Sequence, residues 1–147
     1  MSETDLLRLY SQRILALAAD IPHLGRLPAP QGTARRRSPL CGSTVTADVV
    51  LHEGRISQFA QDVKACALGQ AAAAVAGAAM IGRSRAELEA ARDALAAMLT
   101  EGGPVPAAPF DGFEALLPAR DYRNRHASIL LALEAAAEAT TAAEARA

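Results

Sequence analysis

The sequence predicts an α+β protein in which a small antiparallel β-sheet packs against several α-helices. Two neighbouring segments, 43–51 and 55–64, have the residue pattern of strands joined by a turn. Stretches on either side of them carry apolar residues at helical spacing. Of the 147 residues, 51% are hydrophobic, only 3% are aromatic, and 36 are alanine. We therefore expect a core of closely packed aliphatic helices.

The first predicted element is an amphipathic helix at 2–19, behind a Ser2 or Thr4 cap. Prolines and glycines exclude a regular helix from the following segment, so this segment is predicted to be an extended connector. The length fits one core, and we expect one domain over 1–147. Its parts are the N-terminal helix at 1–20, the connector at 21–40, the hairpin at 41–66 and a helical part at 67–147.

The hairpin is predicted from alternation of residue types in its first strand and a glycine turn at His52–Arg55. The second strand, 55–64, has a weaker pattern, and a third strand in the sheet is possible. Cys41 precedes the first strand and Cys66 follows the second. Because the outer ends of an antiparallel hairpin lie side by side, the two thiols are expected to converge.

The rest of the chain is predicted to be helical. Small apolar residues fill 67–81, which is expected to form a buried helix, and Ser84 and Glu87 form a capping box for the next helix. Asp111 can cap a short helix that Pro118 closes. The expected helices after the first buried one are 84–100, 111–117 and a last helix from about Tyr122 or Arg125 into the C-terminal tail.

Composition argues against several classes of function. The net charge of −1 gives no global field for nucleic acid or an anionic membrane. The sequence shows neither an apolar run long enough to span a bilayer nor a signal-peptide pattern, so we expect a cytoplasmic protein. The basic run Arg35–Arg37 is interpreted as a solvated part of the connector.

The two cysteines are the candidate functional residues. Two are too few for a secreted disulfide framework, which directs attention to metal or thiol chemistry. Cys66 lies where a strand ends and a helix begins, a place that favours the thiolate. An inert buried thiol is an equally good interpretation of Cys66 alone. The placement of both cysteines at matching ends of one hairpin favours a functional pair.

Histidines and known motifs add little by themselves. His126 opens the last helix and, taken alone, is more typical of a capping or surface residue than of a ligand. His23 and His52 are expected on the surface. The sequence contains no catalytic triad spacing, paired-carboxylate pattern, Walker loop or dinucleotide fingerprint, so an ordinary enzyme is not indicated.

The order of these features resembles the IscU/SufU/NifU N-terminal family of iron–sulfur cluster assembly scaffolds. The resemblance covers about 38–133. It is carried by a Cys-Gly before a strand, a Glu-Gly turn, a second strand ending in Cys, a small-residue helix and a late helix opening at a histidine. The matching segments are SPLCGSTVTADVVL, EGRISQFAQDVKACALGQAAAA and RHASILLALEA.

The resemblance implies a metal site, with no catalytic role. In the family, three cysteines and an aspartate hold iron, zinc or a transient [2Fe–2S] cluster, and many members have a histidine before the third cysteine. Carried over, Cys41, Cys66 and His126 are the implied metal- and cluster-binding residues. The third-cysteine position is matched to Ala127 and the aspartate position to Ser43. The sequence therefore predicts an incomplete ligand set.

The resemblance also implies partners, namely a cysteine desulfurase and iron–sulfur acceptor proteins. Residues 121–125 lack the Leu-Pro-Pro-Val-Lys motif with which IscU-type members engage their chaperone, which favours the SufU side of the family. Three interpretations stay open. Two chains could share a cluster as a homodimer, the chain could be a degenerate zinc-binding interaction module, or the two cysteines could carry out thiol or sulfur-transfer chemistry.

Overall fold

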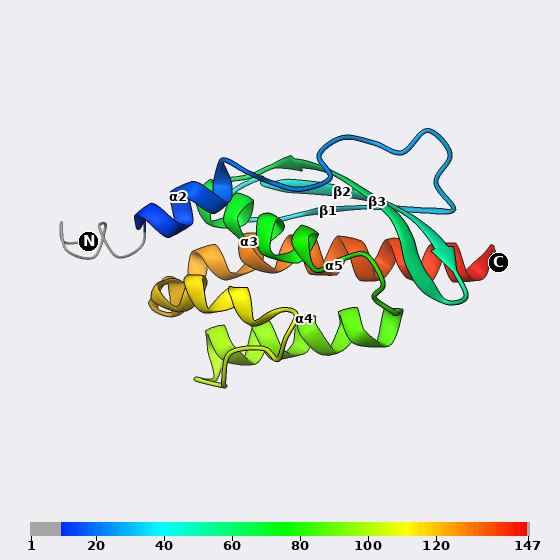
Figure 1. Ribbon diagram of the computed structural model, residues 1–147. Helices are drawn as coiled ribbons and strands as arrows, with labels where there is room; N and C mark the ends of the chain where they lie inside the picture. The colour runs from blue at the N-terminus through cyan, green and yellow to red at the C-terminus, as the bar shows by residue number, and fades with distance from the viewer. Residues whose placement is uncertain (1–9, 147) are drawn as a thin grey trace.

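The computed structural model describes residues 10–146 and shows the predicted α+β fold. A three-stranded antiparallel sheet in the order β1-β2-β3 packs on one face against α3 and α5, and α4 lies on the far side of α5 (Figure 1). Helix α2 (Gln12–Ala18) packs against α3. Residues 2–9 of the helix predicted at 2–19 lie outside the described part of the chain, and α2 begins after a Ser11 cap.

The sheet confirms the hairpin and contains the possible third strand. Strands β2 (Thr44–His52) and β3 (Arg55–Lys64) pair as expected. The third strand, β1 (Gly32–Arg37), pairs with β2 from within the segment predicted to be connector. The basic run is therefore part of an edge strand. Its Arg36 points to the helical layer and lies 3.4 Å from Glu138 of α5.

The helices follow the sequence with two differences. Helices α3 (Ala67–Ala78) and α4 (Arg85–Thr100) lie within the predicted ranges. The predicted short helix at 111–117 is present as a 3₁₀-helix, η1 (Asp111–Asp121), but Pro118 lies inside it and does not close it. Pro118 has no N–H to donate, so one hydrogen bond of the helical pattern is missing at this position. Helix α5 runs over Arg123–Ala145.

Helix α5 is the centre of the packing, which explains the excess of alanine. It contacts β1, β2, α3 and α4. A Cβ atom on Gly32 would collide with the backbone of Ala139 and Ala143, so β1 lies directly against α5. Small side chains permit such close approach. The buried alanines of α5 are Ala132, Ala135, Ala136, Ala137, Ala139 and Ala143.

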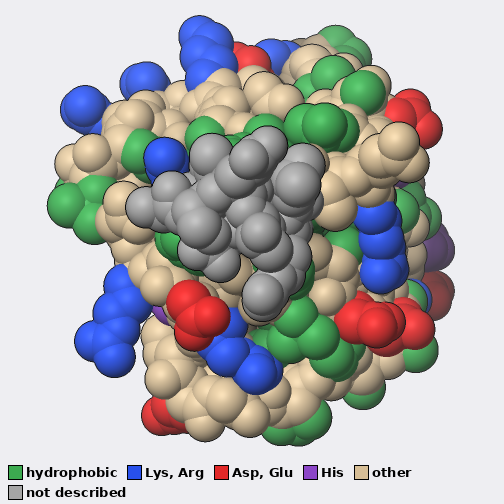
Figure 2. All heavy atoms as spheres, turned by 90° about the vertical axis from the view of Figure 1, so that its left-hand side faces the viewer, with side chains coloured by type: hydrophobic (Ala, Val, Ile, Leu, Met, Phe, Trp, Pro, Cys, Tyr) green, Lys and Arg blue, Asp and Glu red, His purple; other side chains and the backbone are tan. Residues whose placement is uncertain are grey.

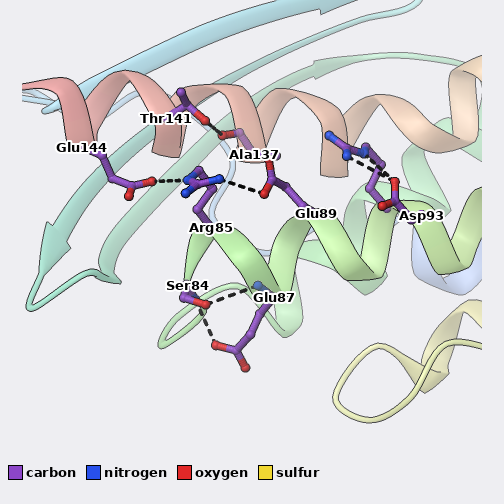
Figure 3. Close-up of polar contacts among 9 residues, drawn as sticks. Ser84, Arg85, Glu87, Glu89, Asp93, Ala137, Thr141 and Glu144 are labelled. Atoms are coloured by element: carbon purple, nitrogen blue, oxygen red, sulfur yellow. Dashed lines mark hydrogen bonds and ion pairs between the residues drawn. The ribbon is translucent and has the colours of Figure 1, made fainter.

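Side chains at the start of α4 join it to the end of α5, as Figure 3 shows. Arg85 forms ion pairs with Glu89 at 2.9 Å and with Glu144 at 2.6 Å. The predicted capping box is present, because Ser84 Oγ accepts from the Glu87 N–H and Glu87 Oε1 accepts from the Ser84 N–H. The ion pair between Arg85 and Glu144 therefore connects the start of α4 to the end of α5.

A buried carboxylate holds the connector on the other face of the sheet. Asp48 of β2 is fully buried and accepts hydrogen bonds from Arg26 at 2.6 Å and Thr33 at 2.6 Å. The Leu27 N–H donates to it at 3.0 Å. Burial alone would raise the pKa of Asp48, but the bonds from Arg26, Thr33 and Leu27 lower it below its ordinary value. We call these four residues the Asp48 cluster.

The connector also protects the outer edge of β3. Gln61 exchanges backbone hydrogen bonds with His23 and Gly25, and its side chain donates to the Pro22 and Ala73 carbonyls. Short pairings of this kind cover a sheet edge that would otherwise present unpaired backbone groups. No helix among residues 10–146 is long and apolar enough to cross a membrane.

Candidate functional site

The predicted pair of thiols lies at the end of the sheet where β2 begins and β3 ends. Cys41 occupies the turn between β1 and β2, which is closed by a hydrogen bond from the Ser38 N–H to the Ser43 carbonyl. Gly42 has a φ of 73°, a left-handed conformation that favours glycine. Cys66 is the N-cap residue of α3. The register of the hairpin brings these two ends together, as the sequence predicts.

Two serine hydroxyls connect the thiols. Cys41 Sγ lies 3.0 Å from Ser43 Oγ, and the Ser128 hydroxyl donates to Ser43 Oγ at 3.1 Å. Ser128 Oγ also lies 3.6 Å from Cys66 Sγ. The path from one sulfur to the other therefore runs through two hydroxyl groups. We call Cys41, Ser43, Cys66 and Ser128 the thiol pocket.

The two sides of the pocket differ in access to solvent. Both serines are buried, whereas Cys41 is exposed and Cys66 is half-buried. Ser43 and Ser128 therefore form the floor of the pocket, and Cys41 is the sulfur that a molecule from solution meets first. Both cysteines are free thiols.

Hydrogen bonding makes the Cys41 thiol unusually acidic. Partial burial would raise its pKa, but hydrogen bonds with Ser38, Ser43 and Ser128 outweigh this effect and lower the pKa to about 7. Ser38 Oγ lies 3.3 Å from the sulfur. A thiolate is the form that binds metals and attacks sulfur compounds, so about half of the Cys41 side chains are reactive near neutral pH.

Ser128 is the site residue that sequence reasoning missed. The resemblance matched the third-cysteine position to Ala127, but the α5 side chain that contacts Cys66 and Ser43 is Ser128. Successive residues of a helix are rotated by about 100°, so a shift of one position decides which side chain enters the pocket. The sequence did contain a signal for Ser128. Serine is mostly exposed in proteins, and a buried serine beside the inward-facing apolar residues of α5 indicates a polar site.

His126 has a different environment from the two thiols. Its Nε2 lies 3.0 Å from the carbonyl oxygens of Ala119 and Arg120 at the end of η1. Carbonyl oxygens only accept, so Nε2 carries a proton and donates to them. His126 is buried and joins η1 to α5. His126 lies two positions before Ser128 on α5, so its side chain faces away from that of Ser128. It contacts η1, and the structure does not bring it to the cysteines.

The thiol pocket of one chain does not fit the cargo that the family resemblance implies. Within the described range, no group of three or more His, Cys, Asp and Glu side chains is arranged to hold a metal ion. The donors that do converge are two thiols and two hydroxyls. A [2Fe–2S] cluster is normally held by four thiolates, and zinc by four sulfur, nitrogen or carboxylate ligands. One chain therefore supplies half of a thiolate set.

The other two histidines lie on the surface, as expected. His52 is exposed in the turn of the hairpin, 3.8 Å from Glu53. His23 is exposed in the connector, and its ring makes a T-shaped contact with Phe59 at a centroid distance of 5.9 Å. Neither belongs to the thiol pocket.

The fold and the pocket define a small α+β protein that presents a pair of thiols at one end of an antiparallel sheet. Solved structures with the same fold are known. A nitrogen-fixing NifU-like protein (N-terminal) from Brucella abortus is 42% identical, with a TM-score of 0.92 over 97% of this chain and 99% of that one. The chain therefore belongs to the IscU/SufU/NifU-like family.

Two further structures share the fold. A hypothetical protein is 25% identical, with a TM-score of 0.78 over 92% of this chain and 98% of that one. An iron–sulfur cluster assembly scaffold protein for the SUF system from Fervidobacterium islandicum AW-1 is 18% identical, with a TM-score of 0.79 over 91% and 98%. The sequence matches no family model and no curated protein.

Proposed function

We propose that this protein acts in iron–sulfur cluster assembly as a scaffold or carrier, and that Cys41 and Cys66 are its cargo-binding residues. The observation that carries the proposal is the convergence of the two thiols on one pocket, through Ser43 and Ser128, in a fold shared with a NifU-like protein. The cargo is iron, zinc or a transient [2Fe–2S] cluster that passes on to acceptor proteins.

The number of thiols sets the stoichiometry of this proposal. Two thiolates per chain supply half of the four that a [2Fe–2S] cluster requires. A cluster held by cysteine alone is therefore bound between two chains, each contributing Cys41 and Cys66. The exposure of Cys41 supports this arrangement, because the open side of the pocket faces solvent.

Sulfur transfer is the second candidate function, favoured by the low pKa of Cys41, which is about 7. The partner is a cysteine desulfurase that carries a persulfide. The Cys41 thiolate attacks the outer sulfur of that persulfide and forms a new S–S bond. The donor's own S–S bond breaks and its cysteine leaves as a thiolate, so the step involves no net oxidation.

Anaerobic reconstitution tests the scaffold proposal. Iron, sulfide and a cysteine desulfurase are expected to give the absorption and circular dichroism of a cluster, with one cluster per two chains. Cys41→Ala and Cys66→Ala are each expected to abolish the signal, while His52→Ala, which changes an exposed histidine outside the pocket, leaves it unchanged. A signal that is absent, or that survives both cysteine substitutions, contradicts the proposal.

Mass spectrometry separates the two candidates. After incubation with desulfurase and free cysteine, a sulfur carrier gains one sulfur atom that reductant removes and that Cys41→Ala prevents. Metal analysis of freshly purified protein is the complementary measurement. One tightly bound zinc per chain, without any capacity for iron and sulfide, would instead identify a zinc-binding interaction module.

A further inference from the structure

The sheet has two outer edges, and the chain covers only one of them. On β3, the N–H and C=O of Gln61 bond to the connector at His23 and Gly25. The outer edge of β1 has no comparable pairing with any residue that the structure describes. Exposed edges of this kind are the places where another strand can add to a sheet.

The hydrogen-bond pattern shows which backbone groups of β1 face outwards. In an antiparallel pair, residues that bond to the partner strand alternate with residues whose N–H and C=O point away from it. The Ser38 N–H donates to the Ser43 carbonyl at 2.8 Å, in the register that continues from β1 and β2. The even-numbered residues of β1 therefore bond to β2. The N–H and C=O of Thr33, Arg35 and Arg37 point outwards, and within residues 10–146 they have no hydrogen-bond partner.

The arginines of β1 differ in their surroundings. Arg36 points to the helical layer, where the Glu138 carboxylate lies 3.4 Å from its guanidinium. Because side chains alternate along a strand, Arg35 and Arg37 point to the opposite face of the sheet. Both are exposed, and neither forms an ion pair in the described part of the chain. We call these two side chains, together with the outward backbone groups of β1, the β1 edge.

The sheet surface beside the β1 edge is more positive than negative. The register places Thr46 between Arg35 and Asp62, and it places Lys64 in the same row as Arg37. Figure 2 views the molecule from the end at which β1 finishes, and Lys and Arg side chains project into solvent at the top and upper left, on the side of the sheet. The β1 edge therefore combines unpaired backbone groups with unpaired positive charge.

A second copy of the chain is a poor partner for this edge. Antiparallel pairing of two β1 strands about Arg35 would place this arginine directly opposite its own copy, and Arg37 opposite Thr33. Like charges in directly opposed positions destabilise a pair of strands. The arginines therefore disfavour self-association through this edge, and the same charges attract a strand that carries carboxylates.

We propose that the β1 edge binds an extended acidic segment of a partner protein, which adds to the sheet as an antiparallel fourth strand. In this mode of recognition, backbone hydrogen bonds provide affinity and alternate side chains provide specificity. The residues opposite Arg35 and Arg37 are two positions apart on the added strand, so these are the ones that carry carboxylates. The inference goes beyond the proposed function and does not depend on it.

Peptide binding, followed by fluorescence anisotropy, tests the β1 edge. The probe is a fluorescein-labelled, C-terminally amidated peptide, Thr-Val-Glu-Val-Glu-Val-Thr, whose glutamates have the required spacing. Its controls carry the same charge and differ only in which amides are N-methylated. Methylation of both glutamate N–H groups removes the donors that face β1 and is expected to abolish binding. Methylation of two valine N–H groups, which face away, should change the affinity by less than about twofold.

Substitutions in the chain separate charge from backbone pairing. We expect Arg35→Gln/Arg37→Gln to weaken binding about tenfold at low salt, and by less at high salt. The control Arg13→Gln/Arg123→Gln removes the same charge at exposed positions outside β1 and should keep the wild-type affinity. Arg35→Pro loses the outward N–H together with the charge, so it should bind at least about threefold more weakly than Arg35→Ala. Circular dichroism checks that each variant is folded.

Amide hydrogen exchange measured by NMR identifies the groups that the peptide covers. In the free chain, the N–H groups of Thr33, Arg35 and Arg37 are expected to exchange faster than those of Ala34 and Arg36, which bond to β2. Saturating peptide should slow the exchange of the three outward N–H groups and leave the other two unchanged.

Several outcomes would overturn the inference. Absence of peptide binding would leave the arginines with a protective role only. Slow exchange of the outward N–H groups in the free chain would show that the edge is already covered, and slowing that grows with protein concentration would identify a second copy as its partner. Binding that survives methylation of the glutamate amides would be electrostatic contact without strand addition. None of these results bears on cluster reconstitution, which depends on Cys41 and Cys66.

Discussion

Two polar clusters lie on the same sheet and are built in opposite ways. In the Asp48 cluster a fully buried carboxylate accepts hydrogen bonds from a guanidinium, a hydroxyl and a backbone N–H. In the thiol pocket, weak donors and acceptors meet at 3.0 to 3.6 Å, and Cys41 is open to solvent. A cluster that is fully satisfied within the chain stabilises the fold. A cluster with spare ligand capacity at the surface is available for chemistry.

The largest expected effect is a gain in zinc affinity when the ligand set of the thiol pocket is completed. Ser43→Asp with Ser128→Cys would supply three thiolates and a carboxylate, a full tetrahedral set for zinc. We expect zinc affinity to rise on the order of 10³-fold, equivalent to about 4 kcal/mol. Competition against a chromophoric chelator measures this affinity.

The matched control for this gain is Ser43→Asp with Ala127→Cys, which places the third thiol where the sequence resemblance put it. Because Ser128 is the side chain that meets Cys66, the control is expected to gain far less. A larger gain from the Ala127 variant would show that α5 presents a different face to the pocket.

The same comparison shows which parts of the site the sequence could predict. Alternation in β2 and the glycine turn place Cys41 and Cys66 together, because strand pairing is local. Ser128 is 62 residues from Cys66. Its contact depends on the rotation of α5, which local pattern does not determine to within one residue. His126 has the residue type of a ligand, but its hydrogen bonds to η1 arise from tertiary packing.

Prediction of the fold failed where local signals were misleading. Strand β1 was not predicted, because the prolines and glycines of this segment are typical of a loop. Only Gly32 and Ala34 of β1 are buried, and the arginines that follow have the residue type of a solvated loop. The Asp48 cluster was not predicted either, because Arg26 and Asp48 are 22 residues apart and neither belongs to a recognisable motif. The hairpin, the capping box and the long helices were predictable because each depends on neighbours in sequence.

The next largest effect concerns the Asp48 cluster. Asp48→Ala leaves the Thr33 hydroxyl and the Leu27 N–H without their acceptor and removes the partner of Arg26. We expect the free energy of unfolding to fall by about 2–3 kcal/mol. Cys41→Ala, at an exposed position, is expected to change it by about 0.5 kcal/mol or less. Urea denaturation of both variants measures the difference, and equal losses would contradict the contrast between the two clusters.

The pH dependence of unfolding provides a second measurement on Asp48. Its pKa is lower in the folded chain than in the unfolded chain, so its contribution is present above the unfolded pKa of about 4. The contribution is lost as the pH falls through the lower, folded pKa. We therefore expect wild-type stability to decline more steeply in acid than that of Asp48→Asn. Parallel pH profiles would contradict the depressed pKa.

The smallest expected effect concerns the reactivity of Cys41. Since its pKa is about 7, the rate of alkylation by iodoacetamide should rise with pH and reach half of its maximum near pH 7. Ser43→Ala removes one of the hydroxyls that stabilise the thiolate, so the midpoint should move to higher pH. The alkylation rate at pH 7 should then fall about twofold to threefold.

Peptide mass spectrometry assigns the label to Cys41 or Cys66, and Ser57→Ala serves as a control because that exposed serine lies near the hairpin turn, outside the pocket. An unchanged midpoint in Ser43→Ala would mean that the pocket serines do not set the acidity of the thiol. A raised alkylation midpoint in Ser43→Ala, together with an unchanged free energy of unfolding in urea, would show that the hydroxyl acts on the reactivity of Cys41 only. The donors to Asp48, in contrast, act on the stability of the fold.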